Sequence, residues 1–195
     1  MIKAWVPPKW CKYLAGVDEV GRGALAGHVL AVAVILPANE KIMGLADSKR
    51  LTESRRLLLY PEIIDRAVCY SVGRAGSDEI DDINILQATL IAMTRAVSNL
   101  RVQPDFVAVD GNTLPKWSHR SESIVGGDSF IDSISAASVV AKVIRDREMS
   151  EYDKKYPGYN FSSNKGYGTR AHLSSLRDLG PSPIHRYTFA PLKYG

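Results

Sequence analysis

The sequence has only two cysteines, Cys11 and Cys69, and neither belongs to a Cys-x-x-Cys motif or to a cysteine–histidine cluster. This scarcity excludes a disulfide scaffold and a typical zinc site. Cys69 lies in the apolar run 68–70, which predicts a buried, inert thiol. We therefore expect a reducing, cytoplasmic setting.

Long apolar segments are also missing. No run approaches the roughly 20 residues that span a bilayer, and the first nine residues lack the apolar core of a signal peptide. The chain has no internal repeat and no low-complexity segment. These absences predict a soluble protein, expected to be a monomer, with no membrane partner.

The composition is that of an ordinary globular protein. Of 195 residues, 45% are hydrophobic and 24% are charged, which is enough to build one domain with a small appendage. The 25 basic and 21 acidic residues give a net charge of +4 and a pI of about 9.0. This balance fits a polyanionic partner such as a nucleic acid, and it fits an ordinary solvated surface equally well.

Four short apolar segments predict strands, and they alternate with helical patterns. The strands are expected at residues 14–18, 29–36, 68–74 and 106–110. The first two are apolar on both sides, as in a sheet that is covered on both faces. Strands separated by helices predict an α/β fold, with a mixed sheet flanked by helices over residues 1–155. Residues 156–195, rich in Gly, Pro, Tyr and basic residues, are expected to form a small C-terminal helical appendage packed on that domain.

Three segments predict helices. One runs from Ile83 to Leu100, where apolar residues recur at intervals of three and four. A second begins after Thr52 and is expected to kink at Pro61. A third runs from about Ser133 to Tyr152, and small residues at its start allow a neighbouring element to approach closely. The side chains expected to face the core are Leu57, Ile63 and Ile64 in the second helix and Ile83, Leu86, Leu90, Met93, Val97 and Leu100 in the first.

Acidic residues end two of the predicted strands. Asp18 and Glu19 are followed at once by the Gly-Arg-Gly turn 21–23, and Asp110 ends another apolar run. Ligands of open α/β sheets collect beyond the strand ends, so these acids are expected to meet. Because adjacent residues of a strand face opposite sides, Asp18 and Glu19 converge only if the backbone turns near Glu19, which the glycines of the turn allow.

A fourth acid, Asp128, lies just before the third helix. Carboxylates without His or Cys are hard oxygen ligands, which favour Mg²⁺ or Mn²⁺ over Zn²⁺. Phosphodiester hydrolysis uses such sites with two ions about 3.5–4 Å apart. Without metal the four carboxylates would repel one another, so at least one of their pKa values is expected to be raised.

Each of these acids also has a purely structural interpretation. Asp110 and Asp128 are typical turn residues, and Asp132 is expected to cap the third helix at its N-terminus. The spacing alone therefore leaves two interpretations open, a metal site and a set of structural acids.

The motifs taken in order resemble those of the ribonuclease HII family in its bacterial form. The agreement extends over roughly residues 14–192, and the chain shows neither a clamp-binding peptide nor the extra N-terminal domain of ribonuclease HIII. It departs at Ala24, where the family often has Pro, at Ala46, where Asn is common, and at Tyr187, where a second basic residue is frequent. The motifs that carry the resemblance are Asp18–Gly23, Asp47–Lys49, Ile83–Thr89, Asp110–Asn112, Gly127–Asp128 with Ser133–Ser138, Lys142 with Arg145–Asp146, Tyr156–Tyr159, Lys165–Thr169 and Gly180–Arg186.

The resemblance implies a ribonuclease H-like sheet and a role for each motif. Asp18, Glu19, Asp110 and Asp128 would be the catalytic, metal-binding acids. Gly21, Arg22 and Gly23 would read the ribose 2′-OH, which distinguishes RNA from DNA. Tyr167 would stack on the next sugar, a deoxyribose, although the residue alone also fits an aromatic packed in a Gly-rich loop. Lys49, Lys165 and Arg186 would hold phosphates, although isolated basic residues also fit a plain surface, and His185 is expected to be structural or to contact substrate.

The implied function is that of an endoribonuclease. It would cut the RNA strand of RNA/DNA hybrids and the bond 5′ to a single ribonucleotide in duplex DNA, leaving 3′-hydroxyl and 5′-phosphate ends, with two Mg²⁺ or Mn²⁺ ions. Two alternatives stay open. A junction resolvase of the same sheet class would cut branched all-DNA substrates, and a non-catalytic hybrid-binding protein would not depend on its acids.

Overall fold

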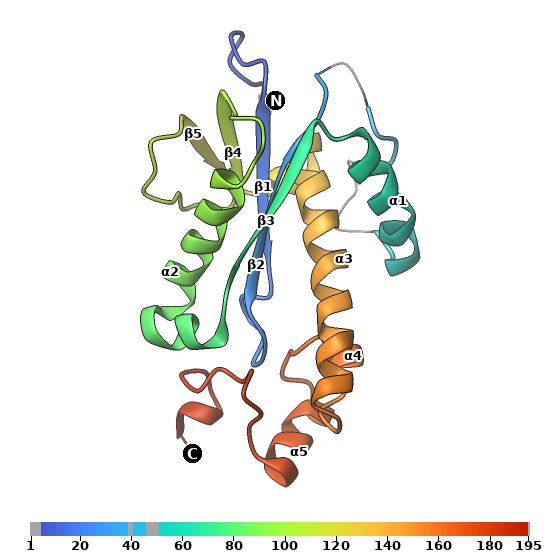
Figure 1. The fold of residues 1–195 in the computed structure, drawn as a ribbon, viewed down its shortest axis with the longest axis vertical. Coiled ribbons are helices and arrows are strands. Elements are labelled where there is room, and N and C mark those ends of the chain that lie inside the picture. Colours follow the sequence, from blue (N-terminus) through green and yellow to red (C-terminus); the bar gives the residue numbers. More distant parts are fainter. Residues whose placement is uncertain (1–4, 39–40, 46–50, 195) are drawn as a thin grey trace.

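A mixed five-stranded sheet forms the centre of the molecule (Figure 1). The computed structural model describes residues 5–38, 41–45 and 51–194. The strand order is β3-β2-β1-β4-β5, in which β1 pairs antiparallel with β2 and parallel with β4. The strands are β1 (Leu14–Val20), β2 (Val29–Ile35), β3 (Cys69–Ala75), β4 (Phe106–Asp110) and β5 (Ser121–Ile124).

The sheet is covered by helices on both faces, as predicted from the doubly apolar strands. The helix α2 (Ser77–Ser98) packs on one face, and α3 (Asp132–Lys155) and α1 (Glu53–Arg66) pack on the other (Figure 1). Strand β2 shows the cause most clearly. Val29, Ala31 and Ala33 enter the core with α2, whereas the alternate residues Leu30 and Val32 enter the core with α1 and α3. The α/β class and the mixed sheet are thereby confirmed.

The first helix pattern was only partly right. Helix α2 begins at Ser77, six residues before Ile83, and Asn84 breaks its regular geometry with φ 70°. The Asn84 side chain accepts hydrogen bonds from the N–H groups of Leu86 and Gln87 and so restarts the helix. The prediction that Leu86 faces the core is wrong, because Leu86 lies just after this break and is exposed.

The other two helices also differ in detail from the sequence patterns. The helix α1 begins after Thr52 as predicted, with Thr52 as its N-cap, and continues through Pro61. Leu57, however, is 46% exposed and does not face the core. The cap of α3 is Ile131 and not Asp132, which is the first helical residue. The single buried row of the short α1 contains Leu59 and Ile63, and Leu57 falls outside it.

Small residues bring α3 close to the sheet, as expected. A Cβ atom on Gly16 of β1 would lie 2.1 Å from the backbone carbon of Ser133, so this glycine is required for the packing. On the opposite face a Cβ on Gly73 of β3 would lie 2.0 Å from the carbonyl oxygen of Ala92 in α2. The helices α3 and α2 therefore pack closely against opposite faces of the sheet.

The C-terminal part is helical and looped and lies beyond the far end of α3 (Figure 1). It contains α4 (Phe161–Asn164), α5 (Arg170–Leu179) and a final 3-10 turn (Leu192–Tyr194). Phe161 and Tyr159 pack with Ala26 and Met149, which joins this part to the sheet and to α3. The division at residues 155 and 156 stays a prediction. In the described parts of the chain, no helix is long and apolar enough to cross a membrane.

Candidate active site

Asp18 and Glu19 lie within β1, not at its end. The strand stays paired through Val20, with Glu19 opposite Ala31 of β2. The turn that was expected near Glu19 begins instead at Gly21, whose φ of +90° favours glycine. Asp18 is buried, and one of its oxygens accepts a hydrogen bond of 2.8 Å from the N–H of Glu19.

Both carboxyl groups have raised pKa values. Burial is the main cause for Asp18, the charges of Glu19 and Asp110 add to it, and the pKa reaches about 8 although Ser138 donates a hydrogen bond. Burial also raises the pKa of Glu19, against the opposing charge and hydrogen bond of Arg22, and Asp110 raises it further. The expected rise in pKa is thus confirmed, with desolvation a larger cause than repulsion.

Asp110 and Asp128 meet beside this pair. Asp110 is the last residue of β4, and Asp128 lies in the 3-10 turn Gly127–Ser129 that follows β5. The backbone N–H of Asp128 donates to an Asp110 carboxylate oxygen at 3.4 Å. Ser135 of α3 donates to the backbone carbonyl of Asp128, which holds the turn against the helix. The strand β5, too short and polar to be predicted, carries the chain to this position.

The four acids are therefore linked through Asp110, whose charge acts on Asp18 and Glu19 and whose side chain contacts Asp128. Among residues 5–38, 41–45 and 51–194, no three or more His, Cys, Asp or Glu side chains are arranged as a metal site. The donor chemistry nevertheless fits a hard divalent cation, because oxygen ligands of this kind suit Mg²⁺ or Mn²⁺ and neighbouring acids raise the pKa values of Asp18 and Glu19. We call Asp18, Glu19, Asp110 and Asp128 the four-acid group.

The Gly-Arg-Gly turn and Tyr167 lie side by side. A Cβ atom on Gly23 would be 3.9 Å from the ring of Tyr167, which is 37% exposed. Arg22 extends outward and donates to a carboxylate oxygen of Glu19 at 3.3 Å. The N–H of Ala24 donates to the carbonyl of Gly21 at 3.4 Å, a bond that proline would not make. Residues far apart in the sequence thus form one surface next to the acids.

Arg186 lies behind this turn. It is fully buried, and its guanidinium donates to the carbonyl oxygens of Gly21, Arg22 and Gly27 at 2.7, 2.8 and 2.9 Å. A phosphate contact, which the family resemblance implied, does not fit this position because the donors face backbone carbonyls inside the protein. Arg145 of α3 is buried beside it, and the sequence analysis had assigned it no role.

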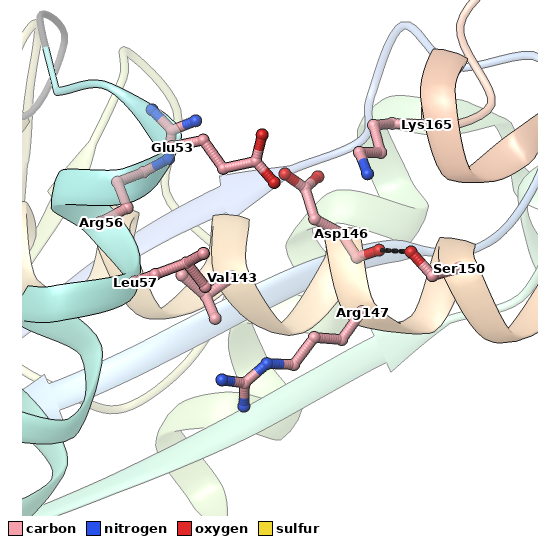
Figure 2. Close-up of a pocket in the computed structure, with 8 residues that line it drawn as sticks. All are labelled: Glu53, Arg56, Leu57, Val143, Asp146, Arg147, Ser150 and Lys165. Carbon is pink, nitrogen blue, oxygen red and sulfur yellow. Dashed lines mark hydrogen bonds between the residues drawn. The ribbon is translucent and has the colours of Figure 1, made fainter.

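Lys165 is the C-cap residue of α4. Its ammonium group donates to the carbonyl of Ser162 at 2.5 Å and borders a cavity of about 100 Å³ between α1 and α3 (Figure 2). A phosphate role for Lys165 stays a prediction. Lys49 and Ala46 lie outside the described residues. The other residues around the cavity are Glu53, Arg56, Leu57, Val143, Asp146, Arg147 and Ser150.

Two histidines form a buried pair in the C-terminal part. The Nε2 atoms of His172 and His185 are 3.0 Å apart, so the pair shares one hydrogen. The Nδ1–H of His172 donates to the carbonyl of Tyr167, the N–H of Ser182 donates to Nδ1 of His185, and the Ser182 hydroxyl contacts the same atom. The structure thus gives His185 a structural role and adds His172, for which the sequence offered no signal beyond its place near the Tyr167 motif.

Comparisons with known proteins agree with this arrangement. A family model described as ribonuclease HII matches residues 15–192. The chain is similar to the ribonuclease H2 of Pyrococcus horikoshii OT3, with 27% identity, a TM-score of 0.78, and coverage of 93% of this chain and 96% of that chain. It shares its fold with the Archaeoglobus fulgidus ribonuclease HII of a PCNA complex, at 22% identity and a TM-score of 0.76, over 89% of this chain and 93% of that one.

A more distant likeness is to a Bst ribonuclease HIII solved with Mn²⁺, at 17% identity and a TM-score of 0.68, covering 93% of this chain and 68% of that chain. The two archaeal structures leave the bacterial form a prediction. The family match, by contrast, extends over nearly the whole described sheet and the C-terminal part. The chain therefore belongs to the ribonuclease HII family and is a ribonuclease H hydrolase.

Proposed function

We propose that the protein cuts the RNA strand of RNA/DNA hybrids and the phosphodiester 5′ to a single ribonucleotide in duplex DNA, leaving 3′-hydroxyl and 5′-phosphate ends. The observation that carries this proposal is the position of the Gly21–Gly23 turn. It begins two residues after Glu19 of the four-acid group, and its last glycine lies next to Tyr167. A sugar-reading surface is thus adjacent to the acids.

Divalent metal ions belong to this proposal. Asp18, Glu19, Asp110 and Asp128 would hold Mg²⁺ or Mn²⁺, and the contact between Asp128 and Asp110, together with the charge of Asp110 on Asp18 and Glu19, supports a shared site. When bound, two such ions supply the positive charge that activates the attacking water and stabilises the leaving oxygen. The ribonuclease HIII neighbour was solved with Mn²⁺, which supports the choice of cation.

The chain's own residues would select the substrate and orient it. The missing side chain of Gly23, where a Cβ atom would meet only the Tyr167 ring at 3.9 Å, leaves room for backbone groups to approach the ribose edge and its 2′-hydroxyl, whereas the missing side chain of Gly21 makes room for Arg145. Tyr167 would place its exposed ring on the following deoxyribose, which favours a junction where RNA passes to DNA. Lys165 and Lys49 would contact phosphates, which position the duplex without reading its sequence.

The direct test uses an end-labelled DNA duplex with one ribonucleotide, incubated with Mg²⁺ or Mn²⁺, with both product ends mapped. We expect a single cut on the 5′ side of the ribonucleotide, no cut in the matched all-DNA duplex, and no product from the variant Asp110→Asn. Cleavage of a branched all-DNA junction would instead identify a resolvase. Tight hybrid binding that Asp110→Asn leaves unchanged, without any cleavage, would identify a binding protein.

A further inference from the structure

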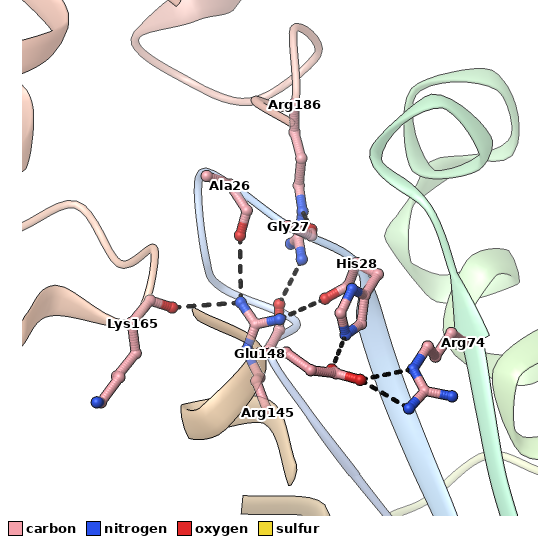
Figure 3. Close-up of polar contacts among 9 residues, drawn as sticks. Ala26, Gly27, His28, Arg74, Arg145, Glu148, Lys165 and Arg186 are labelled. Atoms are coloured by element: carbon pink, nitrogen blue, oxygen red, sulfur yellow. Dashed lines mark hydrogen bonds and ion pairs between the residues drawn. The ribbon is translucent and has the colours of Figure 1, made fainter. Parts of the chain in front are cut away.

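Two guanidinium groups are buried together behind the Gly21–Gly23 turn. Figure 3 shows both groups next to Ala26, Gly27 and His28. Arg145 comes from α3 and Arg186 from the segment after α5, and both side chains have no exposed surface. A Cβ atom on Gly21 would lie 2.6 Å from the Arg145 guanidinium carbon, so the turn rests directly on this group. We call Arg145 and Arg186 the arginine pair.

Within the part of the chain that the structure describes, the hydrogen bonds of the arginine pair go to backbone carbonyl groups. Besides its three bonds to Gly21, Arg22 and Gly27, the pair donates through Arg145 to the carbonyls of His28 at 2.6 Å, Ala26 at 3.2 Å and Lys165 at 3.3 Å (Figure 3). All six acceptors are backbone carbonyl oxygens. Five belong to residues 21–28 and one begins the loop 165–169, which carries Tyr167. The pair therefore fixes the path of one segment and its distance from the other.

Backbone hydrogen bonds also join the segment 21–28 to the loop 165–169 and to Arg186. The N–H of Leu25 donates to the carbonyl of Gly166 at 2.7 Å, and the N–H of Arg186 donates to the carbonyl of Leu25 at 2.9 Å. Gly166 is needed for this approach, because a Cβ atom there would lie 2.6 Å from the Ala26 carbonyl oxygen. The two segments that the proposed function assigns to the ribose and to the next sugar thus form one unit.

Burying two neighbouring guanidinium groups is unfavourable for the stability of the fold, so a functional reason for it is worth seeking. Burial, together with the neighbouring charge of Arg145, lowers the pKa of Arg186 to about 9. Two like charges without water are costly unless the geometry of their hydrogen bonds is good. A planar guanidinium holds several acceptors in fixed directions, whereas an ammonium group is a point charge with free rotation. Buried arginines are therefore suited to a place where several backbone carbonyl groups must be held in fixed directions.

We propose that Arg145 and Arg186 are positioning residues that hold the Gly21–Gly23 turn against the Tyr167 loop, and that this spacing selects a ribonucleotide followed by a deoxyribonucleotide. The inference rests on the proposed function of these two segments. Neither arginine touches substrate, since both lie inside the protein. Their effect passes through the carbonyl groups that they hold.

A positioning role predicts a particular kinetic pattern. Most of the affinity for a duplex comes from phosphate contacts, which the arginine pair does not make. Misplacing a reacting group by about 1 Å, by contrast, slows a reaction by about 100-fold. For the single-ribonucleotide duplex we expect Arg186→Lys and Arg145→Lys each to lower kcat by about 100-fold, with KM nearly unchanged. The lysine keeps the charge and loses the planar fork.

Arg101→Lys is the matched control. Arg101 also donates twice to a backbone carbonyl, that of Val68, but it is exposed, and it lies before the start of β4, whereas Asp110 lies at the end of that strand. This variant is expected to keep the wild-type kcat and KM. A comparable loss of kcat in Arg101→Lys would show that any such arginine matters, and would overturn the proposal.

Amide hydrogen exchange gives a readout independent of activity. In Arg186→Lys the amides of Leu25 and Gly27 should exchange faster, because their partners Gly166 and Ile184 are no longer held in place, while the amides of β2 and α3 keep their protection. Loss of protection throughout the sheet, or kcat within threefold of the wild type, would overturn the proposal. If the wild-type protein itself fails to cut, the proposed function fails, and the exchange pattern still decides whether the pair holds the two segments together.

Discussion

Asp18 is an acid in a buried position, with the like charges of Glu19 and Asp110 beside it. Its pKa of about 8 lies above the value near 4 of an unfolded chain, mainly because of burial and then because of Glu19 and Asp110. The folded protein therefore prefers the protonated acid. Its contribution to stability is complete below pH 4 and is lost as the pH rises towards 8. In its ionised form Asp18 destabilises the metal-free fold, and a bound cation would offset this effect.

Asp18→Asn is therefore expected to stabilise the metal-free protein at pH 7 by about 1–3 kcal/mol and to abolish cleavage. The amide cannot ionise, so it carries no charge into the buried site. Urea unfolding in EDTA measures the difference, which should be small at pH 4, where both side chains are neutral. A lower midpoint for the variant at pH 7 would mean that the Asp18 carboxylate anchors the fold.

Two glycines of the same strand and turn make a contrasting pair. Gly16→Ala would push a methyl group into the backbone of α3 at Ser133, 2.1 Å away, and neither backbone can move cheaply. Gly23→Ala meets its nearest atom, in the Tyr167 ring, only at 3.9 Å. We expect Gly16→Ala to lower the free energy of unfolding by about 2–3 kcal/mol, and Gly23→Ala to change it by less than about 0.5 kcal/mol.

Cleavage assays should reverse the order of these two variants. Gly23→Ala adds a methyl group beside the surface assigned to the sugar, so its kcat for the single-ribonucleotide duplex should fall although its fold is intact. Gly16→Ala should retain cleavage at temperatures where it remains folded. Full activity in Gly23→Ala would remove the close backbone approach from the proposed recognition.

At the scale of elements, the histidine pair connects α5 to the segment that carries Arg186. Burial, with the charge of His172, lowers the pKa of His185 to about 4, and burial also lowers the pKa of His172. Because these values lie below the unfolded value of about 6.5, the neutral rings favour the folded state. Their contribution is complete above pH 6.5 and is lost as the pH falls towards 4.

We therefore expect the metal-free protein to lose about 2 kcal/mol of stability through this pair between pH 7 and pH 5. Carboxyl groups also titrate in part of this interval, so the comparison is made with His185→Gln. That variant should show a flatter dependence of the unfolding midpoint on pH, whatever its absolute stability. An unchanged slope would assign the pH dependence to other groups.

At the scale of the molecule, the sequence predicted the features that depend on local patterns of apolar and small residues. The doubly apolar β2 and the small residues at the start of α3 reflect burial on both faces and close packing, which local patterns record directly. The short polar β5 and the break at Asn84 were missed because partner strands and a side-chain cap decide them. The arginine pair was missed for a related reason. The sequence alone does not distinguish a buried arginine that binds backbone carbonyls from an exposed arginine.

The same long-range contacts predict how the whole chain unfolds. Ala26 pairs with His185 as an isolated β-bridge, the N–H of Gly27 donates to Ile184, and Phe161 packs against Met149 of α3. Residues 156–195 thus complete the β1–β2 connection, and neither part buries these groups without the other. We expect one calorimetric transition, with equal calorimetric and van't Hoff enthalpies. Two separated transitions, with the C-terminal part melting first while α3 and the sheet stay folded, would show that residues 1–155 are stable alone and that the turn can be held without Arg186.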